Sequence, residues 1–199
     1  MRSSHLVKFA VSAALVSAAP AMAQSAAPPP PAEAAALSIP ALRAGLAGQW
    51  TGTLEYRDYT ANEWFGIPMM VRIEDVGDGA TLIRHGQFDD GPTVGIVRIT
   101  TVQFFDAATN TEMTGMYRRG RAVEQVRYEL TLSGTPADAT HWTMVAMTTS
   151  TDDNRPARLR ETTTRNGDTI ETLKEIDWID DAGENWLVRN RTRLTRTGA

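Results

Sequence analysis

The sequence predicts an all-β domain, an antiparallel up-and-down β-barrel of about ten strands. Nine clusters of turn-forming residues separate ten segments of about 8–12 residues, and these segments are rich in Thr, Val, Ile and aromatic side chains. Several segments alternate apolar and polar residues, which is typical of a strand with one buried and one solvated face. No stretch after residue 46 shows helical periodicity.

The turn clusters contain Gly, Pro, Asn or Asp at positions that favour tight turns. Asn166-Gly167 is the clearest hairpin signal, because both residues tolerate the positive φ of a type I′ turn. The clusters lie at residues 58–63, 75–79, 89–92, 106–110, 119–121, 133–138, 151–154, 166–167 and 180–184. Such short connections make successive strands antiparallel neighbours, and closing the sheet into a barrel removes its two exposed edges.

The final segment shows the alternation most clearly. One face is expected to carry Trp186, Val188, Asn190, Thr192 and Leu194, and the other Arg189, Arg191 and Arg193. Ten strands enclose a wider interior than eight, so we expect a cavity that admits a small ligand. A flattened, filled barrel or a sandwich is the alternative.

The chain begins with the pattern of a secretory signal peptide over residues 1–23. Arg2, His5 and Lys8 form a basic start, a short apolar run follows over residues 9–19, and Ala21-Met22-Ala23 matches a cleavage site. Residues 24–45 then form an Ala/Pro-rich linker, with one short helical turn expected over 38–45, and the barrel domain spans 46–199. The predicted product is exported, to the periplasm or the medium, with no transmembrane anchor after cleavage.

Composition excludes several function classes. Beyond the leader the chain carries 18 basic and 24 acidic residues, a net charge of −6, so we expect no nucleic-acid partner. The absence of cysteine excludes disulfides, thiolate chemistry and a lipid anchor on cysteine.

Five polar residues fall in phase with the apolar faces of their segments. A mostly apolar wall with a few convergent polar groups is what a small-molecule pocket needs. The candidate ligand-binding residues are Tyr56, Tyr128, Glu161, Lys174 and Asn190. Alternatively, a bulge turns these side chains to solvent. Lys174, the only lysine beyond the leader, is also a hypothetical base or nucleophile if its amine is buried.

No catalytic motif or cofactor site is predicted. His85 and His141 lie on separate predicted strands without carboxylates at metal-ligand spacing. The acidic pairs 89–90, 152–153 and 180–181 all sit at turns, where Asp caps its own backbone. The chain has neither a Gly-x-Ser-x-Gly elbow nor a Gly-rich phosphate loop.

The domain opens Gly48-Gln49-Trp50, and a Gly-x-Trp in the first strand of such a barrel resembles the calycin-type barrels. These include lipocalins, fatty-acid-binding proteins, avidins and nitrobindin-like haem barrels. The resemblance implies that Trp50 closes the barrel base and that Arg191 or Arg193 packs across it. It implies no haem site, since the last histidine is His141, and only about six residues stand where fatty-acid-binding proteins carry two helices.

The sequence therefore predicts an exported barrel that binds a small, mainly apolar molecule. A second hypothesis is a filled barrel that acts as a protein–protein interaction module through outward Arg158, Arg160, Arg189, Arg191 and Arg193. The competing interpretation of those arginines is pairing with Glu171 and Glu175 on a neighbouring strand. An isomerase-type enzyme working inside the barrel is a third hypothesis.

Overall fold

A computed structural model describes residues 37–198, so the predicted signal peptide and residues 24–36 of the predicted linker lie outside the described residues. The described chain contains two short helices and ten strands. They are α1 (Ile39–Ala44), β1 (Gly48–Asp58), β2 (Glu63–Asp75), β3 (Thr81–Asp89), α2 (Gly91–Val94), β4 (Ile96–Asp106), β5 (Thr111–Arg118), β6 (Arg121–Leu132), β7 (His141–Asp152), β8 (Arg155–Asn166), β9 (Thr169–Trp178) and β10 (Leu187–Arg196).

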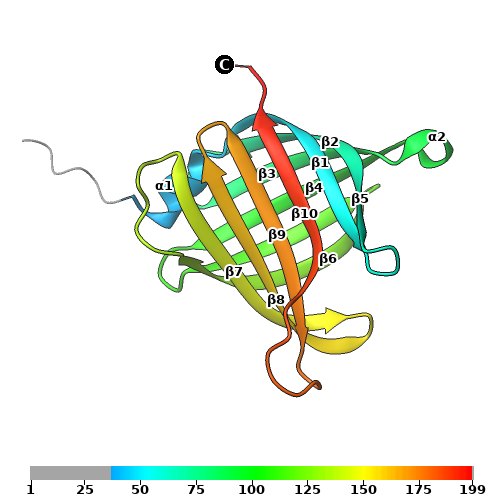
Figure 1. Ribbon diagram of the computed structural model, residues 1–199. Coiled ribbons are helices and arrows are strands. Elements are labelled where there is room, and N and C mark those ends of the chain that lie inside the picture. Colours follow the sequence, from blue (N-terminus) through cyan, green and yellow to red (C-terminus); the bar gives the residue numbers. More distant parts are fainter. Residues whose placement is uncertain (1–36, 199) are drawn as a thin grey trace, which may run out of the picture. The chain divides into compact units, whose positions relative to one another are not determined.

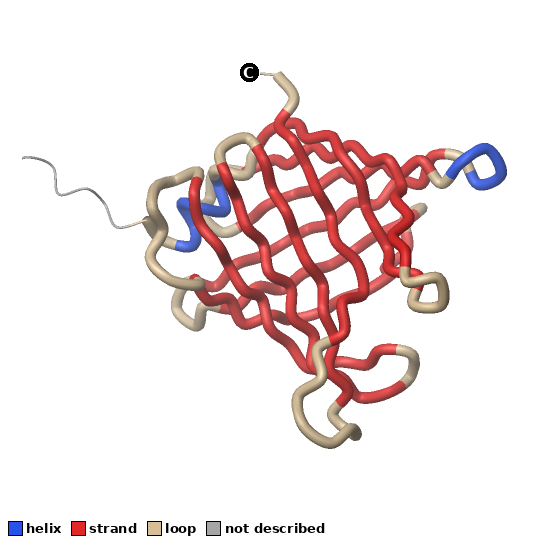
Figure 2. The backbone as a smooth tube through the Cα atoms, viewed as in Figure 1, coloured by secondary structure: helices blue, strands red, loops and turns tan. Residues whose placement is uncertain are grey.

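The ten strands form one closed antiparallel barrel, and each strand pairs with its neighbours in sequence. β10 returns to pair with β1, with Trp50 opposite Arg196 and Tyr56 opposite Asn190. Figures 1 and 2 show the continuous wall that results. The predicted fold class is thus confirmed. Neither described helix is long and apolar enough to cross a membrane.

Helix α1 lies at the end of the barrel where β1 begins (Figure 1). Ser38 caps its N-terminus by accepting from the Ala41 N–H, and Pro40 stands in its first turn. Leu42 of this helix is fully buried in the main hydrophobic core. The short helical turn expected before the domain is therefore an integral part of the barrel base. α2, which was not predicted, occupies the turn between β3 and β4 at the other end.

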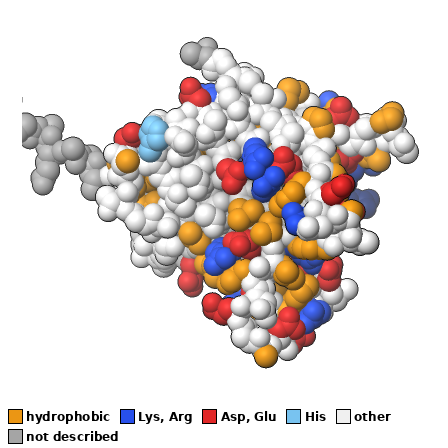
Figure 3. Space-filling view, in the orientation of Figure 1, with side chains coloured by type: hydrophobic (Ala, Val, Ile, Leu, Met, Phe, Trp, Pro, Cys, Tyr) orange, Lys and Arg blue, Asp and Glu red, His pale blue; other side chains and the backbone are white. Residues whose placement is uncertain are grey.

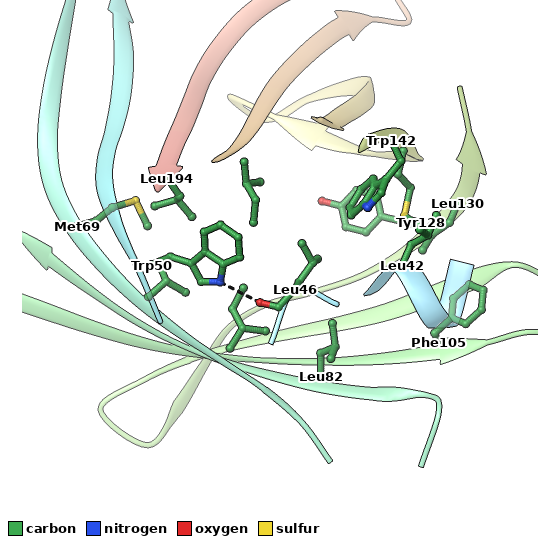
Figure 4. Packing of buried hydrophobic residues seen from close by; sticks show 14 of the residues in the cluster. Leu42, Leu46, Trp50, Met69, Leu82, Phe105, Tyr128, Leu130, Trp142 and Leu194 are labelled. Atoms are coloured by element: carbon green, nitrogen blue, oxygen red, sulfur yellow. Dashed lines mark hydrogen bonds between the residues drawn. The ribbon is translucent and has the colours of Figure 1, made fainter. Parts of the chain in front are cut away.

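The main core fills the barrel at the α1 end. Trp50 is 1% exposed, and its indole N–H donates to the Leu46 carbonyl at 2.9 Å (Figure 4). Leu82, Trp142 and Leu194 converge on the same cluster from other strands. This end is closed by side chains, so Trp50 plays the structural role that the Gly-x-Trp resemblance implied.

Arg196 covers Trp50 at 4.3 Å from the ring centroid, and Arg165 of β8 lies 5.9 Å from the same centroid. The expectation of Arg191 or Arg193 was wrong, because β1 pairs with β10 in a register that sets Trp50 opposite Arg196. Arg191 instead lies 4.1 Å from the ring centroid of Trp64, on the outer face.

A bulge in β10 also changes which residues face inward at its start. Val188 pairs with Glu175 and Asn190 pairs with Lys174, so Arg189 is an extra residue between them. The predicted inward position is confirmed for Asn190, Thr192 and Leu194. It was wrong for Trp186 and Val188. Leu187 takes the inward place and packs in a second small core with Ile176.

The arginines of β8 and β10 are paired with acids on neighbouring strands. Arg193 donates to Glu171 at 2.9 Å, Arg160 donates to Glu175 at 2.8 Å, and Arg191 pairs with Glu55. Figure 3 shows blue and red side chains interspersed on the face built by these strands. The pairing interpretation is confirmed, and the arginines form no basic strip.

Candidate functional site

A cavity of about 360 Å³ lies inside the barrel, and all ten strands contribute to its wall. It is bounded at the α1 end by the main core and beside β8–β10 by the second core of Ala157, Leu159 and Ile176. The volume suits a small organic molecule.

All five predicted site residues line this cavity. Four of them form one continuous row across adjacent strands, because Glu161 is opposite Lys174, Lys174 is opposite Asn190, and Asn190 is opposite Tyr56. Tyr128 reaches the same row from β6 through its hydroxyl. The alternation of β8, β9, β10 and β1 places these side chains inside, so the interpretation that a bulge exposes them is wrong.

Glu161 is the centre of the row's polar contacts. The Tyr128 hydroxyl donates to Glu161 Oε1 at 3.2 Å, and Lys174 Nζ lies 3.6 Å from the same oxygen. Burial, together with the negative charge of Glu161, raises the pKa of Tyr128, so this phenol stays protonated at neutral pH. Lys174 is paired with Glu161 in the cavity wall.

A second polar group, which sequence reasoning missed, lies nearer the base. Glu112 is 5% exposed and forms an ion pair with Arg43 of α1. Gln103 donates to its Oε1 at 2.6 Å, and the Thr114 hydroxyl donates to the same atom at 3.0 Å. Both carboxylate oxygens of Glu112 therefore have partners within the protein, and the ion pair with Arg43 holds α1 against the barrel.

Arg84 and Glu124 also line the cavity and were missed. Both could have been found by the rule that found the other five: Arg84 is in phase with Leu82, and Glu124 is in phase with Val126. Burial lowers the pKa of Arg84, while the charges of Glu112 and Glu161 act in the opposite sense. An arginine remains cationic under such conditions.

The end of the cavity that lies away from α1 is lined by aromatic side chains. Tyr56 stacks on Phe65 with ring centroids 5.5 Å apart, next to the β1–β2 hairpin. The Phe88 ring lies against the wall at Gly86, where a Cβ atom would come within 2.9 Å of it. The site therefore combines charged groups in its interior with an aromatic rim.

A larger hollow of about 680 Å³ follows the outside of β1–β4. The side chains there that alternate with the cavity wall point outward, among them Met70, Arg72 and His85. Arg72 forms an ion pair with Glu74 at the surface, and the His85 ring lies 3.6 Å from the same carboxylate. We place the candidate site inside the barrel, because only the inner cavity gathers partly buried polar groups. Within residues 37–198, no three His, Asp or Glu side chains gather as a metal site would require.

Comparison with known proteins supports the fold. No protein-family model matches the sequence, and no curated protein matches it. Among solved structures the chain is similar to the crystal structure of Rv2717c from M. tuberculosis, with a TM-score of 0.53 and 16% identity over 80% of this chain and 98% of that one. The strand order and the cavity of the described residues define the class, a closed ten-stranded antiparallel β-barrel with an internal cavity.

Proposed function

We propose that this protein is an exported carrier or binding protein that holds a small molecule inside a calycin-like barrel. The observation that carries the proposal is the row from Glu161 to Tyr56, which lines an internal cavity of about 360 Å³. Export rests on the leader pattern of residues 1–23. The sequence predicted a mainly apolar ligand. The aromatic rim supports an apolar portion, and the charged interior calls for a polar portion as well.

The two other hypotheses receive less support. An interaction module was argued from a basic strip, but the arginines of β8 and β10 are paired with carboxylates. The enzyme hypothesis called for a buried Lys174 amine, but the Lys174 side chain is 24% exposed and lies beside Glu161. Small-molecule binding is the function for which the described residues supply both a space and recognition groups.

Native mass spectrometry of the mature protein, purified gently from its own periplasm or medium, tests the proposal. A stoichiometric added mass that disappears on denaturation is the expected result, and its value identifies the ligand class. A bare protein mass, followed by no uptake of an apolar fluorescent dye, would overturn the carrier function.

A further inference from the structure

Two oppositely charged side chains face the cavity without a partner. Of the charged groups around it, Glu112 pairs with Arg43 and Glu161 pairs with Lys174. Arg84 and Glu124 line the same space, and the structure gives neither of them a side-chain hydrogen bond or ion pair within residues 37–198. Partly buried charges are costly unless they are solvated or paired. A ligand that brings complementary charges would supply both missing partners.

The two charges belong to one row of the wall. Arg84 of β3 is opposite Thr101, Thr101 is opposite Met116 of β5, and Met116 is opposite Glu124 of β6. Three strand spacings of about 4.8 Å separate them, which is about 14 Å along the wall. Because both side chains point inward from a curved wall, the distance between their charged ends is shorter than this path. One small polar group can therefore lie between them.

The chemistry of each side chain defines what it accepts. The guanidinium of Arg84 presents a planar set of donors that fits a carboxylate or phosphate in a bidentate contact. The carboxylate of Glu124 accepts from an ammonium group or attracts a quaternary one. Apolar Met116 lies between them in the row, and Phe88 and Ile99 continue the apolar surface towards the rim.

We propose that the ligand is a zwitterionic amphiphile, whose anionic group is bound by Arg84, whose cationic group lies at Glu124, and whose apolar part rests on the aromatic rim. This inference rests on the proposed function, since it names the ligand class of the same cavity. It also differs from the sequence-based expectation of a mainly apolar ligand, because Arg84 and Glu124 carry opposite charges and the other charged groups described in the cavity wall are paired.

A series of ligands with one decyl chain and four head groups tests the proposal by isothermal titration calorimetry. The series is decyl dimethylglycine (zwitterion), decanoate (anion), decyltrimethylammonium (cation) and decanol (neutral), all below their micellar concentrations. The zwitterion is expected to bind the wild-type protein at least about tenfold more tightly than the other three.

Two variants then assign the charges. Arg84→Gln should weaken the zwitterion and decanoate by about tenfold and leave the cation unaffected, while Glu124→Gln should weaken the zwitterion and the cation and leave decanoate unaffected. Arg98→Gln is the matched control, because Arg98 lies on the adjacent strand opposite Gln87 and faces outward. Thermal unfolding of each variant verifies that it is folded.

The outcomes separate the two proposals. If all four ligands bind with equal affinity, or if one single-charge ligand binds most tightly, the zwitterion inference is overturned and the carrier function stands. If none of the four binds at millimolar concentration and an apolar dye is not taken up, the carrier function itself fails. The ranking on the wild-type protein decides these cases even if a variant does not fold.

Discussion

The guanidinium of Arg196 lies 4.3 Å from the ring centroid of Trp50, so the last strand of the barrel is fastened to the first. Arg196 also donates to the Ala47 carbonyl at 2.8 Å and to the Gly45 carbonyl at 2.9 Å. These carbonyls belong to the segment that joins α1 to β1. One side chain thus connects the closure of the barrel with the position of the helix at its base.

Arg196→Ala should lower the free energy of unfolding by about 2 kcal/mol, because it removes a cation–π contact and two charged hydrogen bonds to backbone. Arg193→Ala is the matched control on the same strand. Its pair with Glu171 is half exposed, so it should cost less than about 0.5 kcal/mol. Urea denaturation measures both values. Equal losses in the two variants would contradict the role assigned to Arg196.

Arg43→Met should destabilise the protein by about 3 kcal/mol, because it leaves the buried carboxylate of Glu112 without its cation. The double variant Arg43→Met/Glu112→Gln removes both charges and should be more stable than Arg43→Met alone. A double-mutant cycle by urea denaturation gives the coupling between the two positions. Additive losses would show that the pair does not hold α1 to β5.

Because of Asp177, the stability of the folded protein should decrease at acid pH. The N–H of Asn185 donates to its carboxylate at 2.7 Å and lowers its pKa below the ordinary 3.8, and Arg158 acts in the same direction. A carboxyl group whose pKa is lowered by folding stabilises the native state in full when the pH is above its ordinary pKa. This stabilisation is lost as the pH falls through the pKa of the folded state. Asp177→Asn should therefore have a lower melting temperature than the wild type at pH 7, and the difference between the two melting temperatures should narrow as the pH falls below about 4. Parallel melting curves over this range would refute the assignment.

Tyr128 should not ionise while the barrel is folded, because burial and Glu161 raise its pKa. The chain contains four tyrosines. In an alkaline titration followed by ultraviolet absorbance up to about pH 11, wild type and Tyr128→Phe should show the same amplitude. After denaturation, the variant should show one tyrosine less. A smaller amplitude for the folded variant would mean that Tyr128 titrates normally.

Ala146→Phe should reduce ligand binding by about tenfold or more, since it places an aromatic ring in the cavity beside Glu161. The melting temperature should change much less than ligand affinity, because the cavity has room for the ring. Thr149→Phe on the outer face of the same strand is the control and should bind normally. Binding that survives the filled cavity would place the ligand elsewhere.

The strand number, the turns and the inward face of most strands could be predicted because they depend on local rules. Alternation assigns a residue to a face, and turn residues mark where each strand ends. This was enough to place Lys174 and Asn190 correctly in the wall. The same rule applied to β3 and β6 would have found Arg84 and Glu124.

The predictions that were wrong or missing concern details of strand pairing and of helix docking. The extra residue Arg189 leaves no mark in the alternation, so Trp186 was assigned to the wrong face. The partner of Trp50 depends on a register set by the whole closed sheet, which pairs Trp50 with Arg196. Alternation alone would have excluded Arg193, because Arg193 lies on the face opposite Leu194 and Arg196 lies on the same face as Leu194. The burial of Arg43 likewise requires knowing where α1 docks.

The position of Lys174 also offers a way to measure access to the cavity. It is the only lysine of the chain after residue 8, and its side chain is 24% exposed within the cavity wall. An amine-selective acylating reagent would therefore have a single lysine target among the described residues, reachable from inside the barrel. The rate of that one acylation would report how often the interior is accessible, and protection of Lys174 from acylation would count the molecules whose cavity is occupied.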